Sequence, residues 1–348
     1  MRVWLAALLL LVPFCRPAWA DNPFGLMVWP DNGGDVDIAA ARAAALGVAW
    51  FRPPAAFVER WQVETDCPSC KSVGRVGLAV AITLRHGGRD WAPRRPSTPP
   101  TDPTQYAREV GFIVDAWRPA LLVVENEENE PLSYSDGRVL DSWDSGGDTA
   151  QAYGRELRAA CSVAHAHAIR CANGGLSSEA AAALTWVTLL DQGHPDIACD
   201  FAKHALYTEA DPNAGAALCA YTTVAQIPPD KRARLLRNAD KLLPIYRDAP
   251  IDLVNFHWYG HDATALAETA STLAALTGKP VMSNEIGQHP WDADPQSVRP
   301  LLRAAFAAGL KVAIWFSVDT GVATSLFDAD GRLRPAGMEF AHQMSGRK

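Results

Sequence analysis

Four glutamates lie within nine positions of this chain, in the stretch VVENEENEP at 123–131. The stretch continues the apolar run 120–123, so carboxylates begin where a buried strand is predicted to end. A solvated acidic loop is one explanation. The other is acid/base chemistry, in which one glutamate donates a proton and works with a second carboxylate elsewhere in the chain. Glu285, in KPVMSNEIG at 279–287, also follows a short apolar run and is the candidate partner.

Two glutamates of the first stretch compete for the role of proton donor. Glu127 follows the predicted strand directly, as a residue at a strand end must, and Asn126 beside it is positioned to bind a hydroxyl group. Glu130 lies three residues farther on, where the backbone should already be a loop. We favour Glu127 and keep Glu130 as the alternative.

A working pair of carboxyl groups needs different pKa values, because one must stay ionised while the other keeps its proton. Arg52 ends the apolar stretch AWFR, and a cation beside Glu285 would favour its anionic form. Tyr259, in FHWY at 256–259, is expected to donate a hydrogen bond to the same carboxylate. The second carboxylate, facing an anion, would have its pKa raised.

The elements that must position these side chains alternate between short apolar runs and longer helical stretches. Strands are predicted at 24–29, 48–52, 77–86, 120–127, 169–175, 252–259, 280–287 and 311–319. Helices are predicted at 35–46, 104–117, 149–167, 179–192, 230–247, 263–278, 295–308 and 334–344. Eight strands buried on both faces indicate a parallel sheet and favour a (β/α)8 TIM barrel, with a helical insertion between strands five and six.

An open doubly wound sheet is the alternative fold. It would require a glycine-rich turn after the first strand, and VWPDNGGD lacks the G-x-G-x-x-G spacing. Residues 21–348 are therefore predicted to form one catalytic barrel domain.

Catalytic side chains of such barrels gather at the C-terminal ends of the strands. Read in chain order, the predicted strand ends carry Trp29, Arg52, His86, Asn126, Glu127, Asn173, His257, Tyr259, Glu285 and Trp315. Trp29 and Trp315 are either core aromatics or stacking surfaces for a sugar ring, and His257 is either structural or functional.

At these residues the chain resembles the clan A glycoside hydrolases, retaining (β/α)8 enzymes that include families 5 and 39. The resemblance rests on VVENE (123–127), FHWY (256–259), KPVMSNEIG (279–287) and AIWFS (313–317), and AWFR (49–52) adds a matching arginine. In that clan an Asn-Glu pair closes strand four and supplies the general acid/base, and a Glu closing strand seven is the nucleophile. The resemblance implies that Glu127 and Glu285 are catalytic. Substrate binding would fall to Arg52, His86, Asn126, Asn173, His257, Tyr259 and Trp315.

The predicted function is hydrolysis of a β-linked oligo- or polysaccharide by double displacement with two glutamates. A non-catalytic carbohydrate-binding barrel is the rival. A metal-dependent barrel hydrolase is disfavoured because the first strand carries no H-x-H, and DADG at 328–331 lacks the later acids of a calcium loop. We therefore expect no metal and no cofactor. No G-x-S-x-G nucleophile elbow occurs, which disfavours an esterase.

Composition limits the partners and the compartment. The net charge of −7 argues against nucleic acid and anionic membranes as partners. Residues 1–20 have the pattern of a signal peptide ending in AWA, which predicts a secreted or periplasmic protein without a membrane anchor, expected to be a monomer. Six cysteines remain beyond that segment, an even number that favours disulfides. Their proximity in sequence suggests the pairs Cys67–Cys70, Cys161–Cys171 and Cys199–Cys219.

Overall fold

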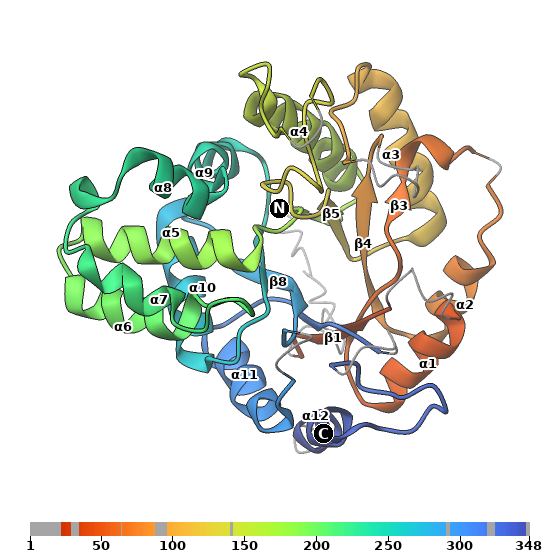
Figure 1. Cartoon of the computed structure of the whole chain (residues 1–348). Helices are drawn as coiled ribbons and strands as arrows, with labels where there is room; N and C mark the ends of the chain where they lie inside the picture. The colour runs from red at the N-terminus through yellow and green to blue at the C-terminus, as the bar shows by residue number, and fades with distance from the viewer. Residues whose placement is uncertain are drawn as a thin grey trace, which may run out of the picture.

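Eight parallel strands form a nearly closed barrel surrounded by helices (Figure 1). The computed structural model describes residues 22–28, 35–63, 65–87, 96–139, 142–289, 293–318 and 324–345. The barrel strands are β1 (Phe24–Met27), β2 (Trp50–Arg52), β4 (Ala79–Arg85), β5 (Leu121–Val124), β6 (Arg170–Asn173), β7 (Val254–Trp258), β8 (Val281–Ile286) and β9 (Ala313–Trp315). They follow the order β6-β5-β4-β2-β1-β9-β8-β7, and two isolated bridges, Ala172 with Leu253 and Leu176 with Phe256, join the ends. The predicted TIM barrel is confirmed.

Successive residues of each strand point alternately into the barrel and toward the helices, and so contribute to two apolar clusters. A small cluster inside the barrel includes Trp50, Leu121, Val123 and Ile314. The residues between them along the strands, such as Leu122 and Trp315, belong to the larger cluster between the strands and the helices. Side chains alternate between the two faces of a strand. When both faces are buried, most positions are apolar, and this is why the barrel strands could be predicted from apolar runs in the sequence.

The barrel helices begin at positions that the sequence marks. They are α1 (Val36–Ala45), α3 (Pro103–Trp117), α4 (Thr149–Ala166), α10 (Ala263–Thr277), α11 (Pro295–Ala307) and α12 (Pro335–Ser345). An Asp side chain accepts backbone N–H groups of the first turn of α1, α3, α10 and α11, and Pro is the first residue of α3 and α11. Both features stabilise a helix start.

Two features of the helices differ from the prediction. The stretch 230–247 is not one helix but two, α8 (Pro229–Leu236) and α9 (Ala239–Asp248), because Arg237 and Asn238 have φ of 43° and 66° and end the first. A helix that was not expected, α2 (Pro68–Val76), starts at Cys67, whose sulfur accepts the N–H of Cys70. The short strand β3 (Ala56–Phe57), paired with β4, was not expected either.

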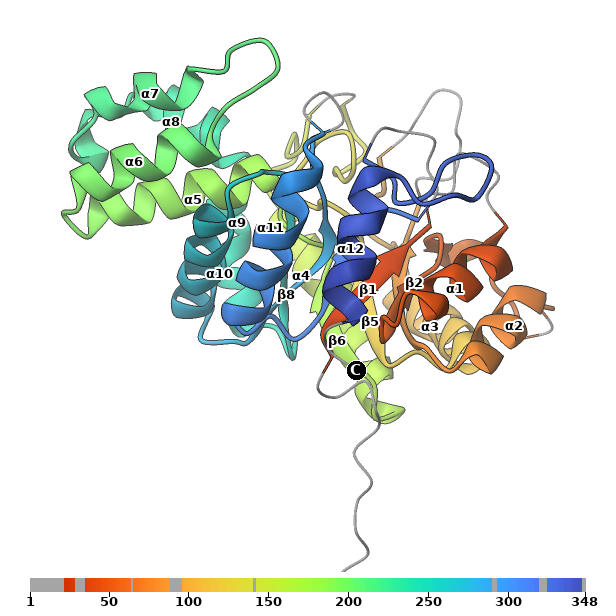
Figure 2. The same ribbon diagram turned by 90° about the horizontal axis from the view of Figure 1, so that it is seen from below.

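Helices between β6 and β7 extend beyond the barrel. This part holds α5 (Ser178–Asp191), α6 (Pro195–Ala205), the short α7 (Ala214–Ala217) with the 3-10 turn Leu218–Ala220, and α8. Figure 2 shows α5 to α8 standing out to one side of the strands, and we call residues 178–236 the helical projection. The helix α9 returns the chain to the barrel, where it contacts α4 and α10.

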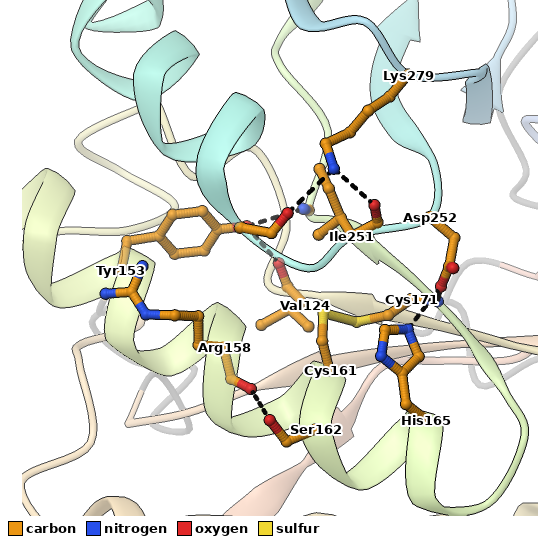
Figure 3. The surroundings of a disulfide bond; sticks show 12 residues. Val124, Tyr153, Arg158, Cys161, Ser162, His165, Cys171, Ile251, Asp252 and Lys279 are labelled. Carbon is orange, nitrogen blue, oxygen red and sulfur yellow. Dashed lines mark hydrogen bonds and ion pairs between the residues drawn. A yellow bond between two sulfur atoms is a disulfide. The ribbon is translucent and has the colours of Figure 1, made fainter.

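All three predicted cysteine pairs have their sulfurs at bonding distance. Cys161–Cys171 ties α4 to β6, and beside it Nε2 of His165 lies 2.9 Å from Asp252 (Figure 3). Cys199–Cys219 holds α6 against the 3-10 turn of the helical projection. Each cross-link restricts the unfolded chain and is worth about 2–4 kcal/mol.

The predicted signal peptide, residues 1–20, lies outside the described residues. Within the described part, no helix has both the length and the apolar character that a bilayer crossing requires.

Candidate active site

The segment after β5 sends its four glutamates in different directions. Backbone φ values of 71° at Glu125 and 46° at Glu127 turn the chain sharply there. Glu128 is buried and anchors the turn, because its Oε1 accepts hydrogen bonds from Tyr153, Asn173 and Tyr246 at 3.2, 2.9 and 2.6 Å. With Glu128 held in this way, the preceding residue Glu127 is directed into the mouth of the barrel, where it meets His257.

Glu285 ends β8 and is held by groups from two other strands. Nη1 of Arg52, at the end of β2, lies 2.5 Å from Oε1 of Glu285. The hydroxyl of Tyr259, just past β7, donates to Oε2 of the same carboxylate at 2.5 Å. Nη2 of Arg52 also donates to Oδ1 of Asn126 at 2.9 Å, which links the two carboxylate-bearing segments. Only 6% of the Glu285 side chain is exposed.

His257 lies between the two carboxylates. Its Nδ1 is 3.0 Å from Oε1 of Glu127 and 3.3 Å from Oε2 of Glu285. Its Nε2 lies 3.0 Å from Oδ1 of Asn284. The Oδ1 of Asn255 accepts the Asn284 backbone N–H at 3.0 Å, and its Nδ2 donates to Oδ1 of Asn284 at 2.6 Å. The Asn284 atom facing His257 is therefore an acceptor, so Nε2 carries a hydrogen and Nδ1 is directed at the carboxylates.

The separation and the charges of the pair suit two different roles. One ligand atom from each of Glu127, His257 and Glu285 lies within 4.8 Å of the other two. Burial raises the pKa of Glu127 and outweighs the hydrogen bond and charge of His257, which lower it; the Glu285 charge adds a smaller rise. Burial also opposes ionisation of Glu285, but the charges of His257 and Arg52 outweigh it and lower the pKa. Glu127 is thus the better proton donor and Glu285 the better anion.

Two glycines after β6 allow the segments to approach closely. A Cβ on Gly174 would lie 2.6 Å from the Glu125 carbonyl carbon and from a carboxylate oxygen of Glu128. A Cβ on Gly175, where φ is 112°, would lie 2.6 Å from Nε2 of His257. The pair Gly174-Gly175 is therefore required for the present positions of the acid segment and of His257.

The structure does not bring every predicted site residue to the carboxylates. Asn126 lies at the site, on Arg52. Asn173 is buried behind the two carboxylates, where its side-chain amide donates to Glu128 and to the backbone carbonyl of Asn255. His86 does not contact either carboxylate of the pair. Its ring Nδ1 lies 2.8 Å from the carbonyl oxygen of Thr98, and its backbone N–H donates to Glu125.

Trp315 is a core residue, which corrects the prediction that it binds substrate. It is 1% exposed and its ring packs edge-on against Phe340 of α12, on the helix side of the strand. Trp29 lies outside the described residues. Glu130 does not face Glu285: its Oε1 accepts from Ser177 at 2.6 Å and pairs with Arg237 at 3.0 Å.

Sequence reasoning left out Asn255 and Asn284, although both lie in the quoted motifs. A buried Asn within an apolar strand was the available signal, because a buried amide must find partners.

Glu127, His257 and Glu285 are also the one group of three in the described part whose donor atoms lie close enough for a metal ion. The Glu285 carboxylate already accepts hydrogen bonds from Arg52 and Tyr259, and Arg52 supplies a positive charge beside it. This donor set fits proton transfer better than cation binding.

Comparison with solved structures identifies the fold. A family GH5 subfamily 18 protein from Bifidobacterium longum, solved with Manβ1-4GlcNAc, is 14% identical with a TM-score of 0.57, over 93% of this chain and 78% of its own. A beta-glycosidase matches at 14% identity and TM-score 0.54, over 90% and 86% of the two chains. A family 39 glycoside hydrolase from Bacteroides cellulosilyticus matches at 13% and 0.53, over 95% and 65%.

No protein-family model and no curated protein sequence matches the chain. The fold is therefore that of glycoside hydrolases of families 5 and 39, as the sequence motifs led us to expect.

Proposed function

We propose that this protein is a retaining glycoside hydrolase that cleaves a β-linked oligo- or polysaccharide with Glu127 and Glu285. One observation carries the proposal: two carboxylates, one just after β5 and one in β8, have oxygens within 4.8 Å of one another, with pKa values displaced in opposite directions. Retaining glycosidases place their two carboxyl groups about 5–5.5 Å apart. The glycoside hydrolase neighbours support the same reading at the level of fold.

In the first step, Glu127 gives its proton to the glycosidic oxygen while Glu285 attacks the anomeric carbon. The bond to the leaving sugar breaks, and its electron pair remains on the protonated oxygen. Arg52 and Tyr259 hold the Glu285 carboxylate in one orientation, so little reorganisation precedes attack. The 27% exposure of the Glu127 side chain leaves its oxygen accessible to the substrate.

In the second step, Glu127 removes a proton from water as that water attacks the anomeric carbon. The bond to Glu285 breaks and the sugar leaves with its original configuration. His257 lies 3.0 Å from Glu127 and its pKa is raised, since the charges of Glu285 and Glu127 outweigh the effect of burial. The proton that Glu127 takes from water replaces the one it gave to the leaving oxygen, so the cycle closes without another donor, and the role of His257 is to hold the two carboxylates in position.

The rival function is carbohydrate binding without catalysis. It does not require an arginine, a tyrosine and a histidine on one buried carboxylate, whereas a nucleophile does.

Secretion, which the first twenty residues predict, belongs to the proposal as well and suits the three disulfides.

The test is a screen of aryl β-glycosides and defined oligosaccharides, with and without a chelator, in which the anomer of the first product is read by NMR. We expect turnover that the chelator leaves unchanged, with a β-configured first product. Binding without turnover would support the rival, and loss of activity on chelation would indicate a metal-dependent hydrolase.

A further inference from the structure

A second hollow lies in the helical projection, away from the carboxylates. It has a volume of about 490 Å³ and is enclosed by α5, the connection from α6 to α7, and α8. Apolar side chains, among them Leu206, Leu218 and Leu235, form one part of its wall. Polar groups, among them Glu179, Thr208 and Arg237, form another, and Tyr207 supplies an aromatic ring.

One contact connects this hollow to the segment that carries the proton donor. Nη1 of Arg237 lies 3.0 Å from Oε1 of Glu130, and Ser177 donates to the same oxygen at 2.6 Å. Glu130 is three residues from Glu127, on the buried turn that Asn129 and Glu128 anchor. Arg237, in the polar wall of the hollow, is therefore linked through Glu130 to the segment that carries Glu127.

A second contact runs from the nucleophile through aromatic rings. Tyr259, which bonds Glu285, lies 6.5 Å from the His289 ring, centroid to centroid. The His289 ring lies 5.6 Å from the ring of Tyr207. Tyr207 in turn lines the hollow and is only partly buried. Two independent contacts thus lead from the carboxylate pair to the same place.

We infer that this hollow is a distal sugar-binding subsite, filled by a further unit of the same oligosaccharide whose scissile bond lies at Glu127 and Glu285. The inference rests on the proposed function. A pyranose ring has an apolar face and a rim of hydroxyls, and a mixed wall with an aromatic ring, a carboxylate and a guanidinium complements both. The volume lies within the usual range of small-molecule sites.

The subsite has a consequence for substrate choice. A substrate that ends at the carboxylates gains nothing from Tyr207 and Arg237, whereas one long enough to reach the hollow gains additional binding energy. The enzyme should therefore prefer longer oligosaccharides, and this preference should depend on the helical projection.

The experiment compares Tyr207→Ala and Arg237→Ala with Arg232→Ala, a matched control on α8 that is exposed and does not line the hollow. Substrates are an aryl monoglycoside and a series of oligosaccharides from disaccharide to hexasaccharide. We expect kcat/KM on the aryl monoglycoside to stay within about twofold in Tyr207→Ala and Arg232→Ala, whereas Arg237→Ala also removes the partner of Glu130 and is compared by the ratio of its losses on long and short substrates. On the longest substrates, Tyr207→Ala should lose about tenfold or more, which corresponds to about 1.4 kcal/mol, and Arg232→Ala should lose nothing.

Equal losses on short and long substrates, or no loss on either, would overturn the inference while leaving the proposed function intact. A binding measurement separates the two claims in the other direction. Calorimetric titration of hexasaccharide into Glu285→Gln, with and without Tyr207→Ala, reports the subsite even in a protein without turnover. Weaker binding with Tyr207→Ala supports the subsite, and unchanged binding excludes it.

Discussion

The segment after β5 contributes to two carboxyl pairs, and they differ in what surrounds them. Glu127 faces Glu285 at the barrel mouth, where Arg52, His257 and Tyr259 supply a cation and hydrogen-bond donors. Glu125, two residues earlier, faces Glu156 of α4 in the protein interior. The nearest cation there is Arg85, with Nε 3.9 Å from Glu125.

The interior pair keeps a proton. Oε2 of Glu125 and Oε1 of Glu156 are buried and accept no hydrogen bond from any other group of the described chain. Burial raises the pKa of Glu125 to about 7, and burial together with the Glu125 charge raises that of Glu156 well above its usual range. A proton on Glu156 that bonds Glu125 accounts for both oxygens.

The comparison shows that the cations and hydrogen-bond donors around a carboxyl pair decide whether the pair shares a proton or divides into an acid and an anion. Two glutamates without a strong cation share a proton and become a structural link between α4 and the segment after β5. Two glutamates with Arg52 and His257 between them separate into an acid and an anion, which is the condition for a double displacement.

Substitution of Glu127 is expected to have the largest effect on activity. With Glu127→Ala, kcat/KM on substrates with poor leaving groups should fall by about 10²–10⁴-fold, because no acid protonates the departing oxygen. Activated aryl glycosides should lose far less in the first step, and added azide should accelerate the second. Steady-state kinetics across a leaving-group series measures this.

Glu130→Ala is the matched control, since Glu130 pairs with Arg237 rather than with His257. If it shows the leaving-group pattern while Glu127→Ala behaves like the wild type, the proton donor is three residues from where we place it.

The dependence of kcat/KM on pH tests the different pKa values of Glu127 and Glu285. The raised pKa of Glu127 should end activity on the alkaline side, as the acid loses its proton, and the lowered pKa of Glu285 should end it on the acidic side. A bell-shaped kcat/KM profile is expected, and Glu127→Ala should lose the alkaline limb on activated substrates. An alkaline limb that persists in this variant would assign it to another group.

The smallest effect is at the interior pair. Between about pH 4.5 and 7 the unfolded chain loses protons that Glu125 and Glu156 keep when folded, so wild-type stability should fall as the pH rises. Glu156→Gln keeps a donor to Glu125 without needing a proton. Its free energy of unfolding, relative to the wild type, should increase by about 1–3 kcal/mol from pH 5 to pH 8.

Urea unfolding at the two pH values measures this difference, with Glu209→Gln at an exposed position as the control. Activity should survive Glu156→Gln, because the interior pair touches no substrate. A variant with the same pH dependence as the wild type would show that no proton is held there.

Much of this arrangement could be predicted from the sequence, because strands buried on both faces give apolar runs and the candidate site residues lie where these runs end. Arg52, Glu127, His257, Tyr259 and Glu285 were predicted in this way to lie near one another, and the structure brings all five together.

Side-chain direction could not be predicted at the same level. Trp315 lies at a strand end, yet one step along β9 decides between the barrel interior, where Ile314 lies, and the helix side. The destinations of Glu125 and Glu128 were equally hidden, because their partners Glu156, Tyr153 and Tyr246 lie on helices distant in sequence.

The most direct test of the central claim is covalent trapping. Incubation of the wild-type protein with a 2-fluoro β-glycoside slows the second step, so the sugar should remain attached to the nucleophile, and peptide mass mapping should find it on Glu285. Glu285→Gln should fold, bind sugar, lose several orders of magnitude in rate and take up no label. A label on any other carboxylate, or products of inverted configuration, would contradict the account.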